Sequence, residues 1–431
     1  MTLPRRLSSP VVVLLAMVWC TAAAADWSVR FGDVVRVPGG ELAAFDGYPI
    51  DRLALMACGQ DACRPIPFQI DSRDPQGLWL LDEGPELTPQ APPELLTRDA
   101  LLLFMATDAA GRCRRDDLPP AAPTAELRVA DPLTGSSRWA YLVAFPHGAP
   151  RSPVSYVQYE PASDRVRGAH VSLGFSHGVP GYLALSERGS DVGANLLDRF
   201  KVRATATFLF GLIRFSRSEN DLSTEFVGWR QGPIRVIRRQ RQWVRLGWGI
   251  HSPTFGSYTY FYRDFAELPV GLYLNFPPTY FFGNILIRAF LDFRDLHGWS
   301  MVTPSLATPL AVGGGMTMQK DAVNRLPDSW FALVGPQITL LQTLDVSPSL
   351  ATVRRRLYYR EDGVTPDPPE EVAGEQPAIG YQLDQWEHVG SGAHQLQSVS
   401  YALPVGVDAR QFMAAQRAPL WVTVEALPPG G

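Results

Sequence analysis

The stretch that decides the fold of this chain spans residues 228–253 and reads GWRQGPIRVIRRQRQWVRLGWGIHSP. At a period of two residues, one face carries a row of arginines, and the other is largely Ile, Val, Gln and Leu. The arginines of this row are Arg235, Arg239, Arg241 and Arg245. A helix is the alternative, since arginines also recur at i, i+3 and i+7. The glycines and the proline that flank the run favour a strand.

The next segment, SYTYFYRDF at residues 257–265, places three tyrosines on one face of a second strand: Tyr258, Tyr260 and Tyr262. If the two strands pair as a hairpin, arginines lie beside tyrosines, and at about 3.3 Å per residue the arginine row extends over roughly 33 Å. Such charges cannot be buried unpaired. We expect a groove in which tyrosines stack on sugar rings and arginines hold acidic substituents. The alternative is that arginines and tyrosines cover each other. A one-residue shift of register would reverse the faces.

The rest of the chain also predicts strands. Alternating or β-branched segments bounded by Gly, Pro and Asp recur about every ten residues. We expect a mainly β protein, with a small N-terminal β-sandwich domain over residues 26–150. A large antiparallel β-sandwich domain would follow over residues 151–431.

This arrangement resembles a known group of folds. A small domain precedes a large, aromatic antiparallel sandwich, and Gly232–Arg238 reads GPIRVIR. Over residues 152–427 the chain is similar to the galactose-mutarotase-like supersandwich families, which include sugar epimerases and the sandwich domains of polysaccharide lyases. The resemblance implies a concave sheet that faces a sugar. It does not carry over a catalytic set residue by residue.

The first 25 residues read as a signal peptide. Arg5 and Arg6 precede a short apolar run, and Ala23–Ala25 supply the small residues that cleavage requires. A lipid anchor at Cys20 is the alternative. No later segment is apolar enough to cross a membrane, so we expect an exported protein, periplasmic or extracellular. Loss of both arginines changes the net charge from −4 to −6, which argues against nucleic acid as a partner.

Three cysteines remain after such a cleavage. Cys58 and Cys63 flank a Gly-Gln-Asp-Ala turn, which predicts a hairpin closed by a Cys58–Cys63 disulfide. Cys113, in GRCRRDD, would then be a free thiol, an intermolecular partner, or an alternative partner of Cys58. The neighbouring arginines would favour its thiolate. Two thiols without further ligands do not predict a metal site, and we expect no cofactor.

Acid–base chemistry on a sugar needs a histidine, tyrosine or carboxylate in a groove. The candidates are His177, His251, His297 and Glu225. His177 and His297 each precede a glycine in an expected loop, where functional residues often lie. Each histidine alone also fits a surface or structural role. The chain has no Gly-x-Ser-x-Gly, His-Glu-x-x-His or phosphate-loop motif.

Two hypotheses follow. The first is an exported β-sandwich protein that binds carbohydrate, in particular an acidic polysaccharide, with lyase or epimerase activity as an extension. The second is a non-enzymatic envelope protein that acts as a structural or interaction partner in a surface complex. The first predicts arginines and tyrosines in an open groove, and the second predicts that they pair with each other.

Overall fold

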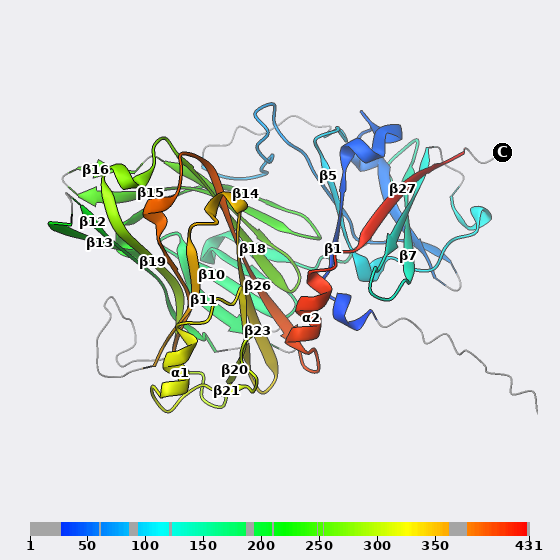
Figure 1. Ribbon diagram of the computed structural model, residues 1–431. Helices are drawn as coiled ribbons and strands as arrows, with labels where there is room; N and C mark the ends of the chain where they lie inside the picture. Colours follow the sequence, from blue (N-terminus) through cyan, green and yellow to red (C-terminus); the bar gives the residue numbers. More distant parts are fainter. Residues whose placement is uncertain are drawn as a thin grey trace, which may run out of the picture.

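The chain is mainly β, as expected (Figure 1). The computed structural model describes residues 27–59, 62–85, 94–119, 123–186, 194–208, 211–247, 249–252, 254–361 and 377–428. The expected signal peptide lies outside the described residues, so it stays a prediction. Among the described residues, no helix is long and apolar enough to cross a bilayer.

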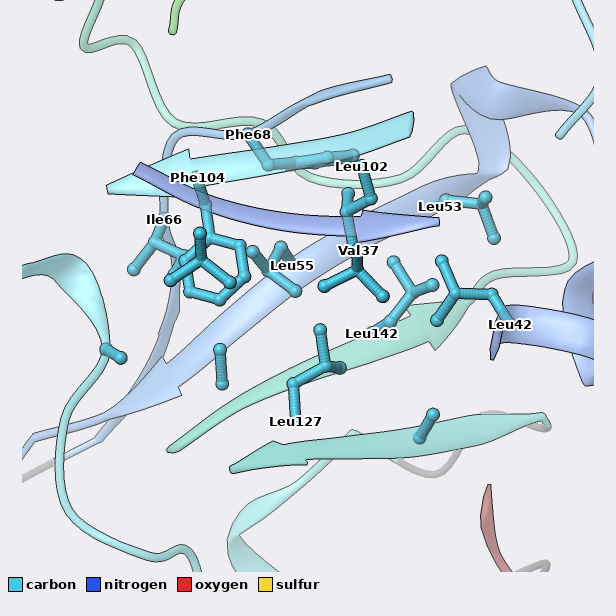
Figure 2. Packing of buried hydrophobic residues seen from close by; sticks show 14 of the residues in the cluster. Val37, Leu42, Leu53, Leu55, Ile66, Phe68, Leu102, Phe104, Leu127 and Leu142 are labelled. Carbon is cyan, nitrogen blue, oxygen red and sulfur yellow. The ribbon is translucent and has the colours of Figure 1, made fainter. Parts of the chain in front are cut away.

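The N-terminal part is a sandwich of two antiparallel sheets. One contains β1 (Val34–Pro38), β5 (Leu101–Met105) and β4 (Gln69–Asp71). The other contains β27 (Trp421–Leu427), β6 (Thr124–Ala130), β7 (Ser137–Ala144), β2 (Leu53–Cys58) and β3 (Cys63–Pro65). Alternate apolar residues of both sheets meet between them, among them Val37, Leu55, Phe104, Leu127 and Leu142 (Figure 2). Burial of each such side chain contributes about 1.5–3 kcal/mol.

The last strand crosses the boundary that we expected at residue 150. Instead of joining the large sandwich, β27 pairs with β6 along its whole length, from Trp421 opposite Ala130 to Leu427 opposite Thr124. Its Val422 and Val424 pack against the N-terminal core. Local sequence pattern identifies a strand but not its partner, so the expected boundary does not hold for this segment.

The large part is built on a ten-stranded sheet. In spatial order it contains β14 (Leu222–Gln231), β15 (Val236–Gly247), β17 (Phe255–Phe261), β18 (Phe265–Leu274), β26 (Gly392–Pro404), β23 (Ile338–Val346), β22 (Trp330–Val334), β20 (Ser300–Val302) and β21 (Leu310–Ala311), with β16 (Ile250–His251) beside β15. All neighbours with a printed register are antiparallel.

Two further sheets cover one face of the ten-stranded sheet. The first contains β13 (Ile213–Ser218), β12 (Leu197–Phe208), β19 (Phe282–Phe293), β25 (Ala378–Asp384) and β24 (Arg354–Arg360). The second contains β11 (Val179–Leu185), β10 (Val171–Ser176), β9 (Arg165–Arg167) and β8 (Gln158–Glu160). Phe331 and Leu340 meet Leu291 and Ile379 in one core, and Val236 meets Tyr159 in another.

The opposite face of the ten-stranded sheet meets the N-terminal sandwich. Leu103 and Met105 of β5 pack there against Phe265 and Val399. Beside this contact, helix α2 (Ala409–Gln416) covers the sheet, and Asp408 caps its first turn. A second helix, α1 (Met318–Val323), lies at the bottom of the large part in this view, near β20 and β21 (Figure 1).

The arginine-rich stretch forms strand β15, which confirms the strand prediction. It pairs with β17 in the expected hairpin, with Arg239 opposite Tyr258 and Ile237 opposite Tyr260. The even-numbered residues face the core, since Val236 is fully buried there. The odd-numbered residues face the N-terminal sandwich or solvent.

The expected Cys58–Cys63 disulfide is wrong. The disulfide joins Cys58 to Cys113, and Cys63 is free. Cys58 and Cys63 do lie opposite each other in the β2–β3 hairpin. However, the segment around Gly111 forms a bridge with Cys58, which brings Cys113 over the same surface. A contact between segments so far apart in the chain leaves no local pattern in the sequence.

Candidate ligand-binding cleft

The first end of the arginine row is buried. Arg235 is 3% exposed, its Nε donates to Asp71 at 2.8 Å, and its Nη1 donates to the hydroxyl of Tyr262 at 3.1 Å. Its guanidinium also lies 4.7 Å from the ring centre of Tyr260 and 4.9 Å from that of Trp79. Asp71 and Trp79 come from the N-terminal part, so here the expected open groove is occupied by the chain itself.

The rest of the row is more accessible. Arg239 lies over the ring of Tyr258 at 5.6 Å, and Arg241 forms a half-exposed ion pair with Glu225 at 3.3 Å. Arg245 is exposed and donates to the backbone oxygen of Asn220. Arginines and tyrosines therefore do share one face, largely in contact with each other. Ligand binding by these residues stays a prediction.

An arginine of the other face is held inside the sandwich. Arg238 is 2% exposed and makes a two-pronged pair with Asp164, at 3.0 and 2.7 Å. Its guanidinium lies 4.2 Å from the ring centre of Phe175. Because every charge here is paired, the arrangement stabilises the contact between β15 and the segment before β9, and leaves no donor aimed at solvent.

The candidate histidines lie on separate segments. His177 occupies the turn between β10 and β11, and its backbone oxygen accepts a hydrogen bond from Thr224, next to Glu225. His251 lies in β16 opposite Arg245. His297 follows β19 and lies near Gly313. Within the described ranges, these histidines make no contact with each other, so an acid–base pair of histidines is not assembled.

A different set of polar residues converges on a cleft of about 300 Å³ between the two parts of the molecule. We call it the β1–β18 cleft. Its polar lining consists of Arg30, Asp33, Arg36, Glu267, Tyr401 and Gln416. Its apolar lining includes Val34, Phe265, Leu420 and Val422. The contributing elements β1, β18, β26, α2 and β27 meet near the centre of the molecule (Figure 1).

Arg36 is the most accessible charge of the β1–β18 cleft, with 41% of its side chain exposed. Its Nη2 donates to Glu267 at 2.5 Å and to the hydroxyl of Tyr262 at 3.2 Å. Burial by itself lowers the pKa of Arg36, but Tyr262 and Glu267 raise it overall. Tyr262 in turn accepts from Arg235, which Asp71 holds. Arg235 and Asp71 thus hold the Tyr262 hydroxyl in position beside Arg36.

Asp33 forms the opposite side of the cleft. It accepts hydrogen bonds from Arg30 at 3.1 Å and from Gln416 at 2.7 Å. Arg30 is fully buried and also donates to Asp131 at 2.7 Å. Burial raises the pKa of Asp33 above its ordinary value, despite these donors. Asp33 therefore holds a proton at higher pH than an exposed aspartate does.

Tyr401 completes the set as a neutral group. Burial, with Glu267 nearby, raises the pKa of its hydroxyl, so the phenol keeps its proton at neutral pH. The β1–β18 cleft therefore presents a guanidinium, a phenol and two carboxyl groups above an apolar floor. Arg36 and Glu267 were not singled out in the sequence, because they lie 231 residues apart. The one indication in the sequence is that Arg36 interrupts a run of valines, Val34, Val35 and Val37.

A second cleft, of about 430 Å³, lies where residues 66–68, 151–155 and 231–233 meet. Its single charged lining residue is Arg151, which lies 4.5 Å from the ring centre of Phe68 and donates to the backbone oxygen of Ile50. Since this arginine is already engaged, the second cleft offers less chemistry than the β1–β18 cleft.

Comparison with known proteins gives no sequence match. No protein-family model and no curated protein matches the chain. Two solved structures from Enterococcus faecalis are similar in structure. One is an alpha-mannosidase from strain V583, with a TM-score of 0.46, 9% identity, and coverage of 94% of this chain and 45% of that one. The other is a protein of glycosyl hydrolase family 38, with a TM-score of 0.47, 8% identity, and coverage of 93% of this chain and 46% of that one. The chain spans less than half the length of each.

Proposed function

We propose that this is an exported β-sandwich protein that binds an acidic carbohydrate in the β1–β18 cleft. The observation that carries the proposal is that the Arg36 guanidinium has donors left without a partner in the described part of the chain. Among the described residues, its Nη2 alone is engaged by Glu267 and Tyr262, while its Nε and Nη1 make no hydrogen bond. Nε and Nη1 point to different sides of the guanidinium, so each can donate a separate charge-assisted hydrogen bond to a carboxylate or sulfate.

The surroundings of Arg36 suit a sugar. Glu267 and Tyr401 supply an acceptor and a donor for hydroxyl groups, and Phe265 supplies an apolar face. The volume lies at the lower end of the range for ligand sites, about 300–1,000 Å³. The resemblance to galactose-mutarotase-like families implies a sugar ligand as well. Any lyase or epimerase step would use Asp33, whose pKa is raised by burial, and Tyr401, whose phenol is neutral.

The test is binding of the mature chain, residues 26–431, to acidic and neutral polysaccharides. We expect salt-sensitive binding to an acidic glycan, and a loss of about tenfold in Arg36→Gln, because a charge-assisted hydrogen bond is removed. Arg325→Gln is the matched control, since Arg325 is 75% exposed and lies outside the cleft. The thermal midpoint of each variant verifies folding.

Two results would contradict this proposal in different ways. Binding that is lost in an Arg239→Gln/Arg241→Gln variant but kept in Arg36→Gln would move the site to the arginine row. Failure of every glycan to bind the folded wild-type chain would reject the carbohydrate function itself.

A second candidate function, contact with a lipid surface in the cell envelope, is favoured by one end of the large part. Leu212, at the tip of the β12–β13 hairpin, is 85% exposed, and Tyr280 and Phe281 before β19 are 70% and 50% exposed. The two segments adjoin, because Phe208 pairs with Phe282. Exposed aliphatic and aromatic residues beside the exposed Arg214 are typical of an interfacial anchor.

Sedimentation with vesicles tests this candidate. The mature chain should sediment with vesicles of phosphatidylglycerol, and Leu212→Ser/Phe281→Ser should reduce the bound fraction severalfold. Val405→Ser is the control, because Val405 is exposed to 59% outside this end. Equal sedimentation of both variants, or none of the wild type, would exclude a lipid contact here.

A further inference from the structure

Three cysteines meet on the outer face of the second N-terminal sheet. Their sulfur atoms all lie within 4.8 Å of one another. Cys58, in the middle, is buried, whereas Cys63 and Cys113 are partly exposed. Cys58 and Cys113 form the disulfide, and Cys63 is a thiol. The thiol of Cys63 thus lies within 4.8 Å of both sulfur atoms of the disulfide.

The backbone permits either partner for Cys58. The Cα atoms of Cys58 and Cys113 are 5.5 Å apart. Cys58 and Cys63 are directly opposite in the antiparallel β2–β3 pair, where Cα atoms are about 4.5–5.5 Å apart. Both separations lie within the range of disulfides, about 4.4–6.8 Å. An exchange of partners would therefore need no rearrangement of the sheet.

We propose that these residues form a thiol–disulfide exchange site. The thiolate of Cys63 attacks Sγ of Cys58, a Cys58–Cys63 bond forms, and the Cys58–Cys113 bond breaks. The bonding electron pair leaves with Cys113, which takes up the proton that Cys63 gave to solvent. One disulfide replaces another, so no oxidant or reductant is required.

Charges around the site set the rate and direction. Burial and the carboxylate of Asp117 raise the pKa of Cys63, so its thiolate is scarce at neutral pH. Cys113 is flanked by Arg112 and Arg114, which favour a leaving thiolate. The hydroxyl of Tyr141, which accepts from the backbone of Cys113, stays protonated because burial raises its pKa to about 12.

Further charged groups belong to the same surroundings. Glu126 accepts from the Tyr141 hydroxyl at 3.0 Å and pairs with Arg112 at 2.9 Å, and Arg64 neighbours Cys63 on its own strand. Burial and the carboxylate of Asp117 oppose formation of the Cys63 thiolate. Exchange should therefore become faster as pH rises, by about tenfold per unit while the thiol is mostly protonated.

Peptide mapping of the mature chain separates the isomers. Trypsin leaves Cys58 and Cys63 together on residues 53–73, because Arg64 precedes a proline, and separates Cys113 from them. Before exchange, this peptide is cross-linked to Cys113 and carries one alkylated thiol. After exchange, it is internally bridged, and Cys113 is alkylated. We expect incubation at pH 9 to increase the second form at a rate independent of protein concentration.

Single cysteine variants test which disulfide forms when one of the three cysteines is absent. Cys113→Ser should form Cys58–Cys63, and Cys63→Ser should keep Cys58–Cys113 and show no exchange at any pH. Both variants should unfold near the wild-type temperature. Cys58→Ser can form neither the Cys58–Cys113 nor the Cys58–Cys63 disulfide and should unfold at a lower temperature. The proposal is overturned if folded Cys113→Ser leaves Cys58 and Cys63 as thiols under oxidising conditions, or if the wild-type map is unchanged at pH 9.

Discussion

Arg235 shows what a buried charge requires. Its guanidinium is surrounded by Asp71, Tyr262 and the rings of Tyr260 and Trp79, which leaves no space for a ligand. Arg241, six residues along the same face, shares a half-exposed pair with Glu225. Arg235, just before β15, and Arg241, within it, therefore contribute differently to stability.

The corresponding prediction compares the two arginines. Arg235→Met should lower the free energy of unfolding by about 1–3 kcal/mol, because the buried Asp71 and Tyr262 lose their hydrogen bonds from Arg235, while Arg230 still pairs with Asp71. Arg241→Met should change it by about 0–1 kcal/mol, as for exposed pairs. Denaturant unfolding measures both. Similar values for the two variants would mean that Arg235 is solvated in solution.

A second prediction at this scale concerns pH and Asp33. Because burial raises the pKa of Asp33, the folded chain binds this proton more tightly than the unfolded chain does. Its contribution to stability is therefore complete below the unfolded value, about 3.9, and is lost as pH rises through the folded pKa.

The comparison with Asp33→Asn isolates that contribution, because the amide does not titrate. Wild type should gain stability relative to Asp33→Asn as the pH falls from 7 to 4. Asp46→Asn, at an exposed position, provides the control. A difference between wild type and Asp33→Asn that does not vary with pH would contradict the raised pKa.

At the scale of elements, the β10–β11 hairpin explains His177 without catalysis. His177 and Gly178 form its two-residue turn and both have positive φ, 51° and 79°. Such a turn matches the twist of the strands and favours Asn-Gly. A Cβ on Gly178 would lie 1.9 Å from the hydroxyl oxygen of Thr224. The glycine after His177 thus has a steric reason, which fits the structural role that we gave as the alternative for this histidine.

This turn gives a paired prediction. Gly178→Ala should destabilise the chain by about 1–3 kcal/mol, through backbone strain and the contact with Thr224. His177→Asn should be neutral or stabilising, because asparagine readily adopts positive φ. Thermal unfolding measures both. If His177→Asn abolishes glycan binding while folding is intact, His177 belongs to a site after all.

The elements also show what sequence could predict. Period-two alternation and the flanking glycines identified β15 and β17 as a hairpin, but not its register, which the structure shows to place Arg239 opposite Tyr258. The same pattern could not show that β4 supplies Asp71 to Arg235, from 164 residues away. The β1–β18 cleft was missed for this reason. Each of its elements reads as an ordinary strand or helix until the two parts are placed together.

At the scale of the whole molecule, β27 joins the end of the chain to its beginning. Without it, β6 becomes an exposed edge, and Val422 and Val424 leave the N-terminal core. A chain that ends at residue 417 should lose the β1–β18 cleft and aggregate on heating. Removal of residues 429–431 alone is the control and should have no effect. If calorimetry gives the shorter chain the same unfolding transition as the full chain, β27 is dispensable for the fold.

The pairing of β27 with β6 also sets an order of events. Residues 124–130 leave the ribosome almost 300 residues before their partner does. The first sandwich, although encoded first, must therefore wait for the last. Until residues 421–427 are available, β6 is an unpaired edge of its sheet. The five-stranded N-terminal sheet therefore stays incomplete until the last strand of the chain has been made.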